Sequence, residues 1–324
     1  MTSETFPGSG EHSPLPGTLL GPVQVRELAK TLGIRPTKTL GQNFVHDAGT
    51  VRRIVRDANV QPGDAVVEVG PGLGSLTLAI LEVGALVSAI EIDPPLAAQL
   101  PHTVAQFLPD AAANFAVLNQ DAMKIAAPQD LACPSAWASA HPGQPFAPKH
   151  LVANLPYNVA VPILIILLEN LPSLETVTVM VQSEVADRLA AEPGSRTYGV
   201  PSVKAAWYAQ TWRGAKISRN VFWPVPNVDS ALVHMKAHKV PREAQRELVF
   251  GVVDAAFAQR RKTLRAALGA WIGSPAQAEE ILTHAGIDFQ LRGERLTIDD
   301  FIRIAQALPA VLSREEIDSL LMRK

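Results

Sequence analysis

The stretch that decides the fold is AVVEVGPGLGSLT, residues 65–77. Its first half is a run of small and β-branched apolar residues, which is typical of a buried strand. Its second half places Gly70, Gly72 and Gly74 directly before an apolar segment of helical length. Glycines after a strand let the backbone turn sharply into a helix and approach a bound molecule closely. The stretch therefore predicts a strand, a ligand-binding turn and a helix.

The same alternation of strand-like and helix-length segments continues from about residue 50 to residue 237. Further strands are expected at 87–93, 115–121, 150–155, 176–183 and in the run that follows residue 229, with helices at 76–83 and 162–170 among the segments between them. The strand runs are almost continuously hydrophobic, as strands covered on both faces should be. We therefore expect a wound, Rossmann-like α/β domain over residues 23–238.

Two segments interrupt this pattern. Residues 1–22 are dominated by Gly, Pro and Ser, so a disordered N-terminal tail is expected. Residues 126–149 contain five prolines and little periodicity, which predicts a long surface insertion between two strands. Its Trp137 and Phe146 are either tethers to the core or contacts to a ligand, and we favour tethers.

The strand signals stop at Pro241. Amphipathic helices are expected at 242–257, 260–272, 275–286 and 297–308, and the capping-box spacing of Ser313 and Glu316 indicates one more short helix. Residues 239–324 therefore predict a small α-helical domain appended to the α/β domain.

Composition narrows the class of protein. Of 324 residues, 47% are hydrophobic and 19% charged, as in globular proteins with a real core. The single cysteine, Cys133, excludes an internal disulfide and a cysteine-rich zinc site; it fits a reducing compartment, and no metal site is predicted. The apolar run at 159–168 is too short for a membrane helix, and residues 1–20 do not resemble a signal peptide. We expect a cytoplasmic protein without a membrane partner.

An acidic residue accompanies the glycine loop. Glu91 ends the second predicted strand, 21 residues after Gly70, where an acid meets the ribose hydroxyls of a bound nucleoside. A site for a nicotinamide dinucleotide would also have a glycine loop and an acid at the end of the second strand. However, this loop is Gly-x-Gly-x-Gly, whereas the dinucleotide fingerprint, Gly-x-Gly-x-x-Gly, has two residues before its last glycine. S-adenosylmethionine has no pyrophosphate to bind, so it is the predicted cofactor, held by Gly70, Gly72 and Glu91.

The sequence NLPYN, residues 154–158, follows the fourth strand of the sheet. An adenine N6 is a poor nucleophile because its lone pair is delocalised into the ring. If the Asn154 side-chain oxygen and the Leu155 carbonyl accept the two N6 hydrogens, the nitrogen is pushed toward tetrahedral geometry. Pro156 biases Leu155 to an extended backbone, and Tyr157 offers a flat face for the base. The alternative is an ordinary turn, since Asn and Pro are common turn residues.

A second aromatic element, FWPVPNVDS at residues 222–230, lies at the start of the last strand run. Its prolines make a stiff loop that could hold Phe222 over the face of the base opposite Tyr157. The alternative is that Phe222 fills the core. Of these two roles, we favour stacking on the base.

These motifs together resemble the ribosomal RNA adenine dimethyltransferases, specifically the bacterial small-subunit enzymes. The matching segments are KTLGQNFV (38–45), VVEVGPGLGSLT (66–77), AIEIDP (89–94), NQDAM (119–123), NLPYNV (154–159), VQSEVADRLAAEPGSRTYG (181–199) and FWPVPNVDSALV (222–233). All seven segments occur in the order that the family shows. The insertion at 126–149 and the N-terminal tail fall outside the common pattern.

The resemblance implies a class I S-adenosylmethionine-dependent methyltransferase fold and a set of site residues. The cofactor would be bound by Asn43, Val45, Gly70, Glu91, Asp121 and Asn154, with Glu91 on the ribose hydroxyls and Asp121 on the adenine amine. Residues 154–157 would hold the target base and Phe222 would stack on it. The expected substrate is a pair of adjacent adenosines in a hairpin near the 3′ end of small-subunit rRNA. The implied partners are this rRNA and the assembling small subunit, and a monomer is expected.

A local excess of cations supports an RNA partner, although the formal net charge of the chain is −2. Residues 236–270 contain eight Lys and Arg against three Asp and Glu, and Arg260, Arg261 and Lys262 are consecutive. Such a run ahead of a helix can contact phosphates or simply be a solvated face. Three other classes remain open: a large-subunit rRNA methyltransferase of the antibiotic-resistance type, a non-catalytic assembly factor, and a nicotinamide oxidoreductase.

Overall fold

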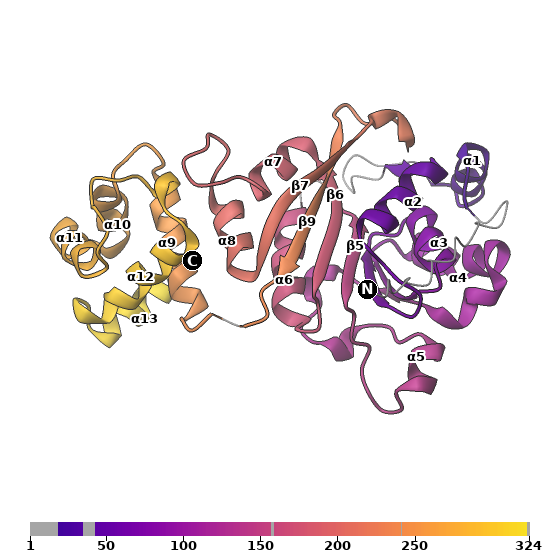
Figure 1. The fold of residues 1–324 in the computed structure, drawn as a ribbon, viewed down its shortest axis with the longest axis horizontal. Helices are drawn as coiled ribbons and strands as arrows, with labels where there is room; N and C mark the ends of the chain where they lie inside the picture. The colour runs from indigo at the N-terminus through magenta and orange to yellow at the C-terminus, as the bar shows by residue number, and fades with distance from the viewer. Residues whose placement is uncertain (1–18, 35–42, 157–158, 241, 323–324) are drawn as a thin grey trace, which may run out of the picture.

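The computed structural model describes residues 19–34, 43–156, 159–240 and 242–322. A twisted sheet forms the centre, helices cover both of its faces, and a group of C-terminal helices lies at one side (Figure 1).

The sheet has seven strands in the order β4-β3-β2-β5-β6-β9-β7. Five neighbouring strands are parallel: β2 (Ala65–Val69), β3 (Leu86–Glu91), β4 (Phe115–Asn119), β5 (His150–Asn154) and β6 (Thr176–Gln182). β9 (Ser230–Ala237) is antiparallel to both β6 and the edge strand β7 (Ala209–Ile217). The strand order reverses between β2 and β5, which is where ligands bind in open α/β sheets. The predicted Rossmann-like fold class is confirmed.

Alternate residues of each strand enter different cores, because side chains in a strand point to opposite faces. Val66 packs with α1 (Pro22–Thr31), α2 (Ala48–Asp57), α3 (Ser75–Glu82) and α4 (Pro94–Phe107). Val67 packs on the other face with α6 (Ala160–Asn170), α7 (Ser183–Leu189) and α8 (Val200–Tyr208). A separate two-stranded ladder joins β1 (Phe44–Val45) to β8 (Phe222–Trp223).

The N-terminal segment and the insertion can be compared with the expectations. Of the predicted tail, residues 1–18 lie outside the described residues, whereas Leu20 is buried and Pro22 begins α1. The insertion at 126–149 carries a short helix, α5 (Ser135–Ala140). Phe146 is fully buried, and the Trp137 ring packs edge-on against it at 5.2 Å between centroids. Both aromatic residues are therefore tethers.

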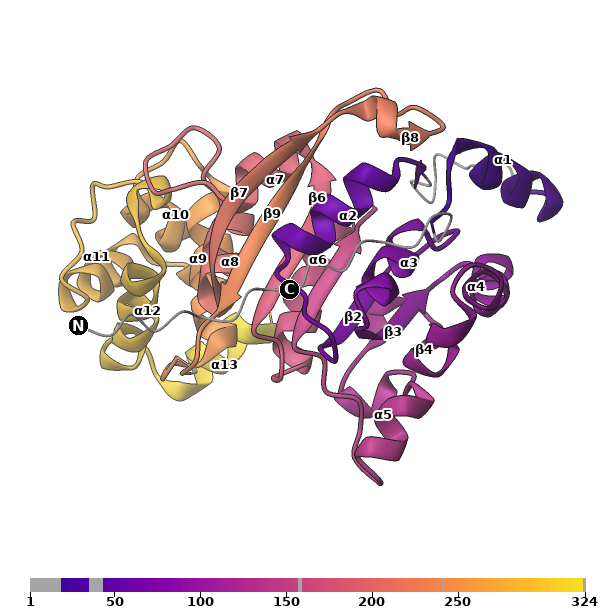
Figure 2. The ribbon, with the colours of Figure 1, turned by 45° about the vertical axis from the view of Figure 1, so that its right-hand side comes forward.

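The C-terminal segment is helical, as predicted. It consists of α9 (Arg246–Ala258), α10 (Leu264–Ile272), α11 (Pro275–His284), α12 (Ile298–Ala307) and α13 (Arg314–Met322). The expected capping box is present, since the Ser313 amide donates to the Glu316 carboxylate at 2.7 Å and the Glu316 amide donates back to Ser313 Oγ at 3.3 Å. These helices share one core with Tyr198 and with Val203 and Trp207 of α8. Figure 2 shows them on the side of the sheet away from α1 and α4.

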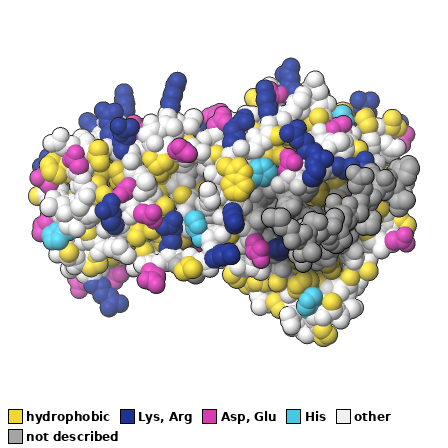
Figure 3. Space-filling model, in the orientation of Figure 1, with side chains coloured by type: hydrophobic (Ala, Val, Ile, Leu, Met, Phe, Trp, Pro, Cys, Tyr) yellow, Lys and Arg dark blue, Asp and Glu magenta, His cyan; other side chains and the backbone are white. Residues whose placement is uncertain are grey.

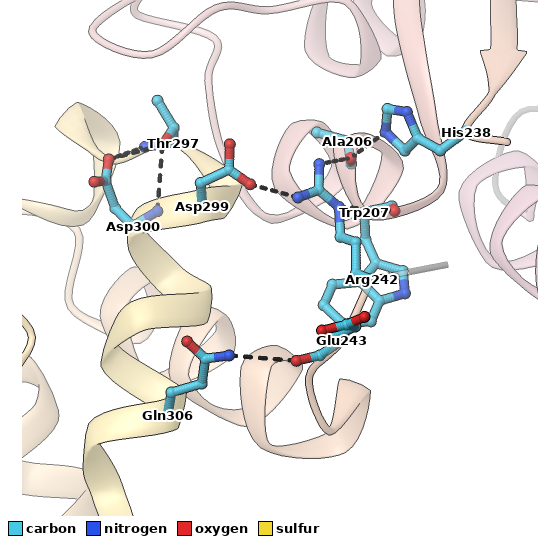
Figure 4. A network of polar contacts seen from close by, with 9 residues as sticks. All are labelled: Ala206, Trp207, His238, Arg242, Glu243, Thr297, Asp299, Asp300 and Gln306. Atoms are coloured by element: carbon cyan, nitrogen blue, oxygen red, sulfur yellow. Dashed lines mark hydrogen bonds and ion pairs between the residues drawn. The ribbon is translucent and has the colours of Figure 1, made fainter. Parts of the chain in front are cut away.

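Arg242 joins the two parts of the chain (Figure 4). Its guanidinium donates to the Ala206 and Trp207 carbonyls at the end of α8, at 3.2 Å each, and pairs with Asp299 in the first turn of α12. The last carbonyls of a helix have no partner within the helix, so this arginine satisfies them while fixing α12 in place. No helix in the described ranges is long and apolar enough to cross a membrane.

Candidate active site

The glycine loop lies where β2 ends and α3 begins. Gly72 has φ +59°, and a Cβ atom at this position would lie 3.0 Å from the Phe44 ring, so only glycine fits without strain. Gly70 donates its amide to the Ile90 carbonyl at 2.9 Å, which holds the loop over the end of β3. The loop thus brings bare backbone to the strand ends, as the sequence predicts.

Glu91 at the end of β3 is fastened to this loop. Its carboxylate accepts hydrogen bonds from the Gly72 amide and from the Asp93 amide, each at 3.0 Å. The side chain is only 4% exposed, and burial raises its pKa above the ordinary value although the two amides act in the opposite direction. The carboxylate is therefore held in one orientation at the rim of the loop.

Glu68 on β2 is a second buried acid, which belongs to the glycine motif at 65–77 but is not among the predicted site residues. It is 1% exposed, and burial raises its pKa to about 8. The Thr77 hydroxyl of α3 donates to it at 2.7 Å. Its position two residues before Gly70 was the one indication in the sequence that Glu68 lies near the site. No pattern in the sequence shows that its carboxyl group is buried.

Asn154 ends β5, the strand on the other side of the switch point. Its side-chain Nδ2 donates to the Asn43 carbonyl at 3.2 Å, and the next residue, Leu155, donates its backbone amide to Met180 at 3.0 Å. Because the nitrogen and oxygen of an amide diverge from one carbon, the bond to Asn43 also fixes the direction of Oδ1. A Cβ at Gly70 would lie 3.7 Å from the Asn154 carbonyl, so the two motifs are in contact distance.

A cavity of about 290 Å³ lies between these elements. The predicted site residues that line it are Asn43, Val45, Gly70, Gly72, Glu91, Asp121, Asn154, Leu155 and Pro156. The Asp121 carboxylate accepts from the Met123 amide at 2.9 Å. Ile92 and Met123 also line the cavity, and both are large apolar residues that remain exposed. These two residues could not be predicted from the sequence, because an apolar residue that contacts a ligand gives the same pattern as an apolar residue of the core.

Two predicted features, Phe222 and the basic run, do not line this cavity. Tyr157 lies outside the described residues. Phe222 is not among the cavity residues; it is 1% exposed, belongs to the core under α1–α3, and pairs through its backbone with Val45. In this conformation the Phe222 ring has no face open to a base, contrary to the favoured expectation. The ladder between β1 and β8 holds the backbone of Phe222, and the ring packs into the core. Its stacking role stays a prediction that requires this ladder to move.

The basic run lies outside the cavity, between α9 and α10. It precedes Thr263, which caps α10, so these residues form a loop rather than the predicted start of a helix. Arg260 pairs with Glu294 at 3.1 Å and donates to the Arg196 carbonyl at 2.7 Å. Arg261 and Lys262 are exposed, and within the described chain they form no ion pair.

The sheet order, the glycine loop and the acid at the end of the second strand define a class I S-adenosylmethionine-dependent methyltransferase. Comparison with known proteins then identifies the family. The model of the ribosomal RNA adenine dimethylase family matches residues 34–309, so the chain belongs to this family. It is an rRNA adenine dimethyltransferase that uses S-adenosylmethionine.

Individual proteins agree with this assignment. The ribosomal RNA small subunit methyltransferase A of Streptomyces avermitilis is 58% identical over 296 residues, which is 91% of this chain and 95% of that protein. Its counterpart in Thermobifida fusca is 59% identical over 292 residues, covering 90% of this chain and 96% of that protein. Among solved structures, a dimethyladenosine transferase from Plasmodium falciparum shares the fold at 20% identity and TM-score 0.66, over 82% of this chain and 98% of that one. The 23S rRNA methyltransferase ErmE is 26% identical with TM-score 0.56, over 82% and 100% of the two chains.

Proposed function

We propose that this enzyme converts two adjacent adenosines, in a hairpin near the 3′ end of small-subunit rRNA, to N6,N6-dimethyladenosine during assembly of the small subunit. Support comes from the relatives named for the small subunit, which are 58–59% identical, whereas the large-subunit methyltransferase ErmE is 26% identical. We also propose that the enzyme acts in the cytoplasm as a monomer.

The cavity suits S-adenosylmethionine. The Glu91 carboxylate, held by two amides, has lone pairs left to accept the ribose hydroxyls, and Asp121 would accept from the adenine amine. The exposed apolar side chains of Ile92 and Met123 would contact the flat adenine ring. The glycine loop leaves room for the chain of the methionine part. When bound, the cofactor supplies an electrophilic methyl group on a sulfonium.

The target amine would be activated by the end of β5. The single observation that carries this step is the hydrogen bond from Asn154 Nδ2 to the Asn43 carbonyl, because it leaves Oδ1 as the acceptor of the amide at the wall of the cofactor cavity. Oδ1 and the Leu155 carbonyl would accept the two N6 hydrogens and localise the nitrogen lone pair. Catalysis is then positioning and electrostatics, with no strong base.

The second methylation places a further demand on the same site. A singly methylated amine has only one hydrogen to donate, so rotation about the C6–N6 bond must direct the first methyl away from the donor. Tyr157 would stack on the base, and Phe222 would join it only when the β1–β8 ladder opens. Arg261 and Lys262 would contact phosphates of the RNA.

The test is to incubate the enzyme and S-adenosylmethionine with small subunits that lack the modification, and to digest the rRNA to nucleosides for mass spectrometry. Dimethyladenosine at two adjacent positions near the 3′ end is expected. Product confined to large-subunit RNA would indicate the resistance-type activity instead. If the cofactor binds and a competent substrate gives no product, a binding-only assembly factor is the better description.

A further inference from the structure

Trp212 is an exposed aromatic residue on the open edge of the sheet. It lies in β7, the last strand in the order of the sheet and the neighbour of β9, and the residue is 46% exposed. The indole stacks on the imidazole of His234 in β9, with 5.7 Å between ring centroids and 27° between planes. This edge is separate from the cofactor cavity, and neither ring lines that cavity.

The surrounding residues hold the His234 ring in place. Its Nδ1 lies 3.0 Å from the Thr178 hydroxyl on β6. Gly214, two residues beyond Trp212 in β7, leaves the space that the ring occupies, because a Cβ there would lie 2.5 Å from His234 Nε2. Any side chain at position 214 would displace the imidazole. The stacked pair, called the Trp212 platform below, is thus supported from two strands.

The two strands that carry the Trp212 platform are rich in cations. Residues 209–219 and 230–239 cover β7, β9 and their ends, and contain five Lys and Arg but no Asp or Glu; the cations are Arg213, Lys216, Arg219, Lys236 and Lys239. Arg213 and Lys216 each pair at 2.7 Å with an acid from outside these segments. Lys236 and Lys239 are exposed and form no ion pair in the part of the chain that the structure describes. Figure 3 shows Lys and Arg side chains above and below the hydrophobic and His groups over this half of the sheet.

The strand register places the Trp212 platform within reach of an RNA bound at the cavity. Asn154 is level with Met180 of β6 and thus with Leu232 of β9, two residues from His234. Trp212 is level with His234, one strand further out. The platform therefore lies three strand spacings, about 14 Å, across the sheet and about 7 Å along it from the end of β5. A short stretch of nucleotides covers this span.

We propose that the Trp212 platform stacks an unpaired base of the rRNA substrate, while Lys236 and Lys239 contact the flanking phosphates. An exposed aromatic face among unpaired cations is the combination that binds single-stranded nucleic acid. Edge strands also carry charge to prevent association between sheets, and this accounts for Arg213 and Lys216. It does not account for an exposed tryptophan with a supporting ring beneath it. The inference rests on the RNA substrate of the proposed function.

The experiment measures equilibrium binding to small subunits lacking the modification, for wild type, Trp212→Ala, Trp212→Phe and the pair Lys236→Gln/Lys239→Gln. Trp212→Ala should weaken binding by about fivefold to 150-fold, and Trp212→Phe by much less, because a phenyl ring still stacks. The lysine pair removes two charges and should flatten the salt dependence of binding, whereas Arg314→Gln on α13, which removes one charge, should leave it nearly unchanged. S-adenosylmethionine affinity, unchanged in every variant, shows that each is folded.

A photoreactive residue at position 212 identifies the occupant. A cross-link to an rRNA nucleotide supports the proposal, and a cross-link to a ribosomal protein overturns it in favour of a protein contact. Unchanged binding by Trp212→Ala also overturns it. These binding and cross-linking readouts do not require methyl transfer. A wild-type enzyme that binds subunits but gives no dimethyladenosine would therefore count against the proposed function alone. The Trp212 platform would still be tested by the binding measurements.

Discussion

The Gly72 amide donates a 3.0 Å hydrogen bond to the buried carboxylate of Glu91. This bond ties the loop after β2 to the end of β3, two elements that are adjacent in the sheet but 19 residues apart in the chain. The carboxylate therefore has two functions: it orders the glycine loop, and it presents its remaining lone pairs to the cavity. Cofactor affinity and loop order should depend on the same residue.

Glu91→Ala should weaken S-adenosylmethionine binding by about 1–3 kcal/mol, because hydrogen bonds to a charged acceptor are lost and the Gly72 amide loses its partner. Glu91→Gln keeps one oxygen as acceptor and should lose less. Isothermal calorimetry measures both, with Glu27→Ala, an exposed acid of α1, as the control. Equal affinity for wild type and Glu91→Ala would remove Glu91 from the cofactor site.

Glu68 predicts a pH dependence of stability. Burial raises its pKa from 4.5 to about 8, so the folded protein holds a proton that the unfolded chain has released. A raised pKa contributes stability that is complete below the unfolded value and is lost as the pH rises through the folded value. Between about pH 4.5 and about pH 8 this contribution should fall by up to about 1.4 kcal/mol per pH unit.

Glu68→Gln replaces the carboxyl by a neutral group of the same size and should remove this slope. Urea unfolding of both proteins at several pH values gives the difference in the free energy of unfolding, in which the other titrating groups cancel. A difference that stays constant from pH 5 to pH 8 would mean that Glu68 is ionised in the folded protein.

The parts of the fold that follow periodicity could be predicted from the sequence. The five parallel strands, the helices α3 and α6 and the C-terminal helices have continuous apolar runs or clear amphipathic spacing. β7 could not be predicted in this way, because AQTWRGAKI lies at an edge and most of its residues are not buried. The β1–β8 ladder is only two residues long on each side, and its existence depends on tertiary contacts.

The site residues likewise fall into those that sequence motifs reveal and those whose placement depends on tertiary contacts. Residues in motifs, such as Gly72, Glu91 and Asn154, could be assigned to one cavity because the carboxyl ends of parallel strands meet at one edge of the sheet. Phe222 could not be placed, since a stiff aromatic loop gives the same sequence pattern whether its ring faces inward or outward. The free or paired state of each cation in the basic run is likewise invisible without the position of Glu294.

The basic run should act through two of its three residues. Arg260 is held by Glu294 and by the Arg196 carbonyl, whereas Arg261 and Lys262 are exposed. The double variant Arg261→Ala/Lys262→Ala should lower RNA affinity and flatten its salt dependence by about 0.7–0.9 log units per lost contact. Arg260→Ala removes one charge and should change the salt slope by less than half as much as the double variant, at a cost of no more than about 1 kcal/mol of stability.

Binding isotherms at several salt concentrations compare these variants, and cofactor affinity should be the same in all of them. A salt slope in the double variant equal to that of wild type would mean that these cations form only a solvated surface. A larger effect from Arg260→Ala than from the double variant would show that the pair with Glu294 opens when RNA binds.

Asn154 should matter most in the transition state, where the N6 nitrogen becomes tetrahedral. Asn154→Ala removes one of the two acceptors and should lower the methylation rate by about 10²–10³-fold, the usual cost of losing one preorganised polar contact to a developing charge. Folding and S-adenosylmethionine binding should change little, because the contact to the amine strengthens only as the methyl is transferred. Asn154→Asp tests the hydrogen-bond acceptor and the orientation of the side chain separately. It keeps the oxygens but has no N–H for the Asn43 carbonyl, so its rate should lie between those of Asn154→Ala and wild type.

Single-turnover methylation at saturating cofactor and subunit, with mono- and dimethyladenosine resolved by mass spectrometry, measures the chemical step directly. If Asn154→Ala methylates at the wild-type rate, the amine is activated by other groups; if the variant loses cofactor binding in proportion to rate, Asn154 belongs to the cofactor site alone.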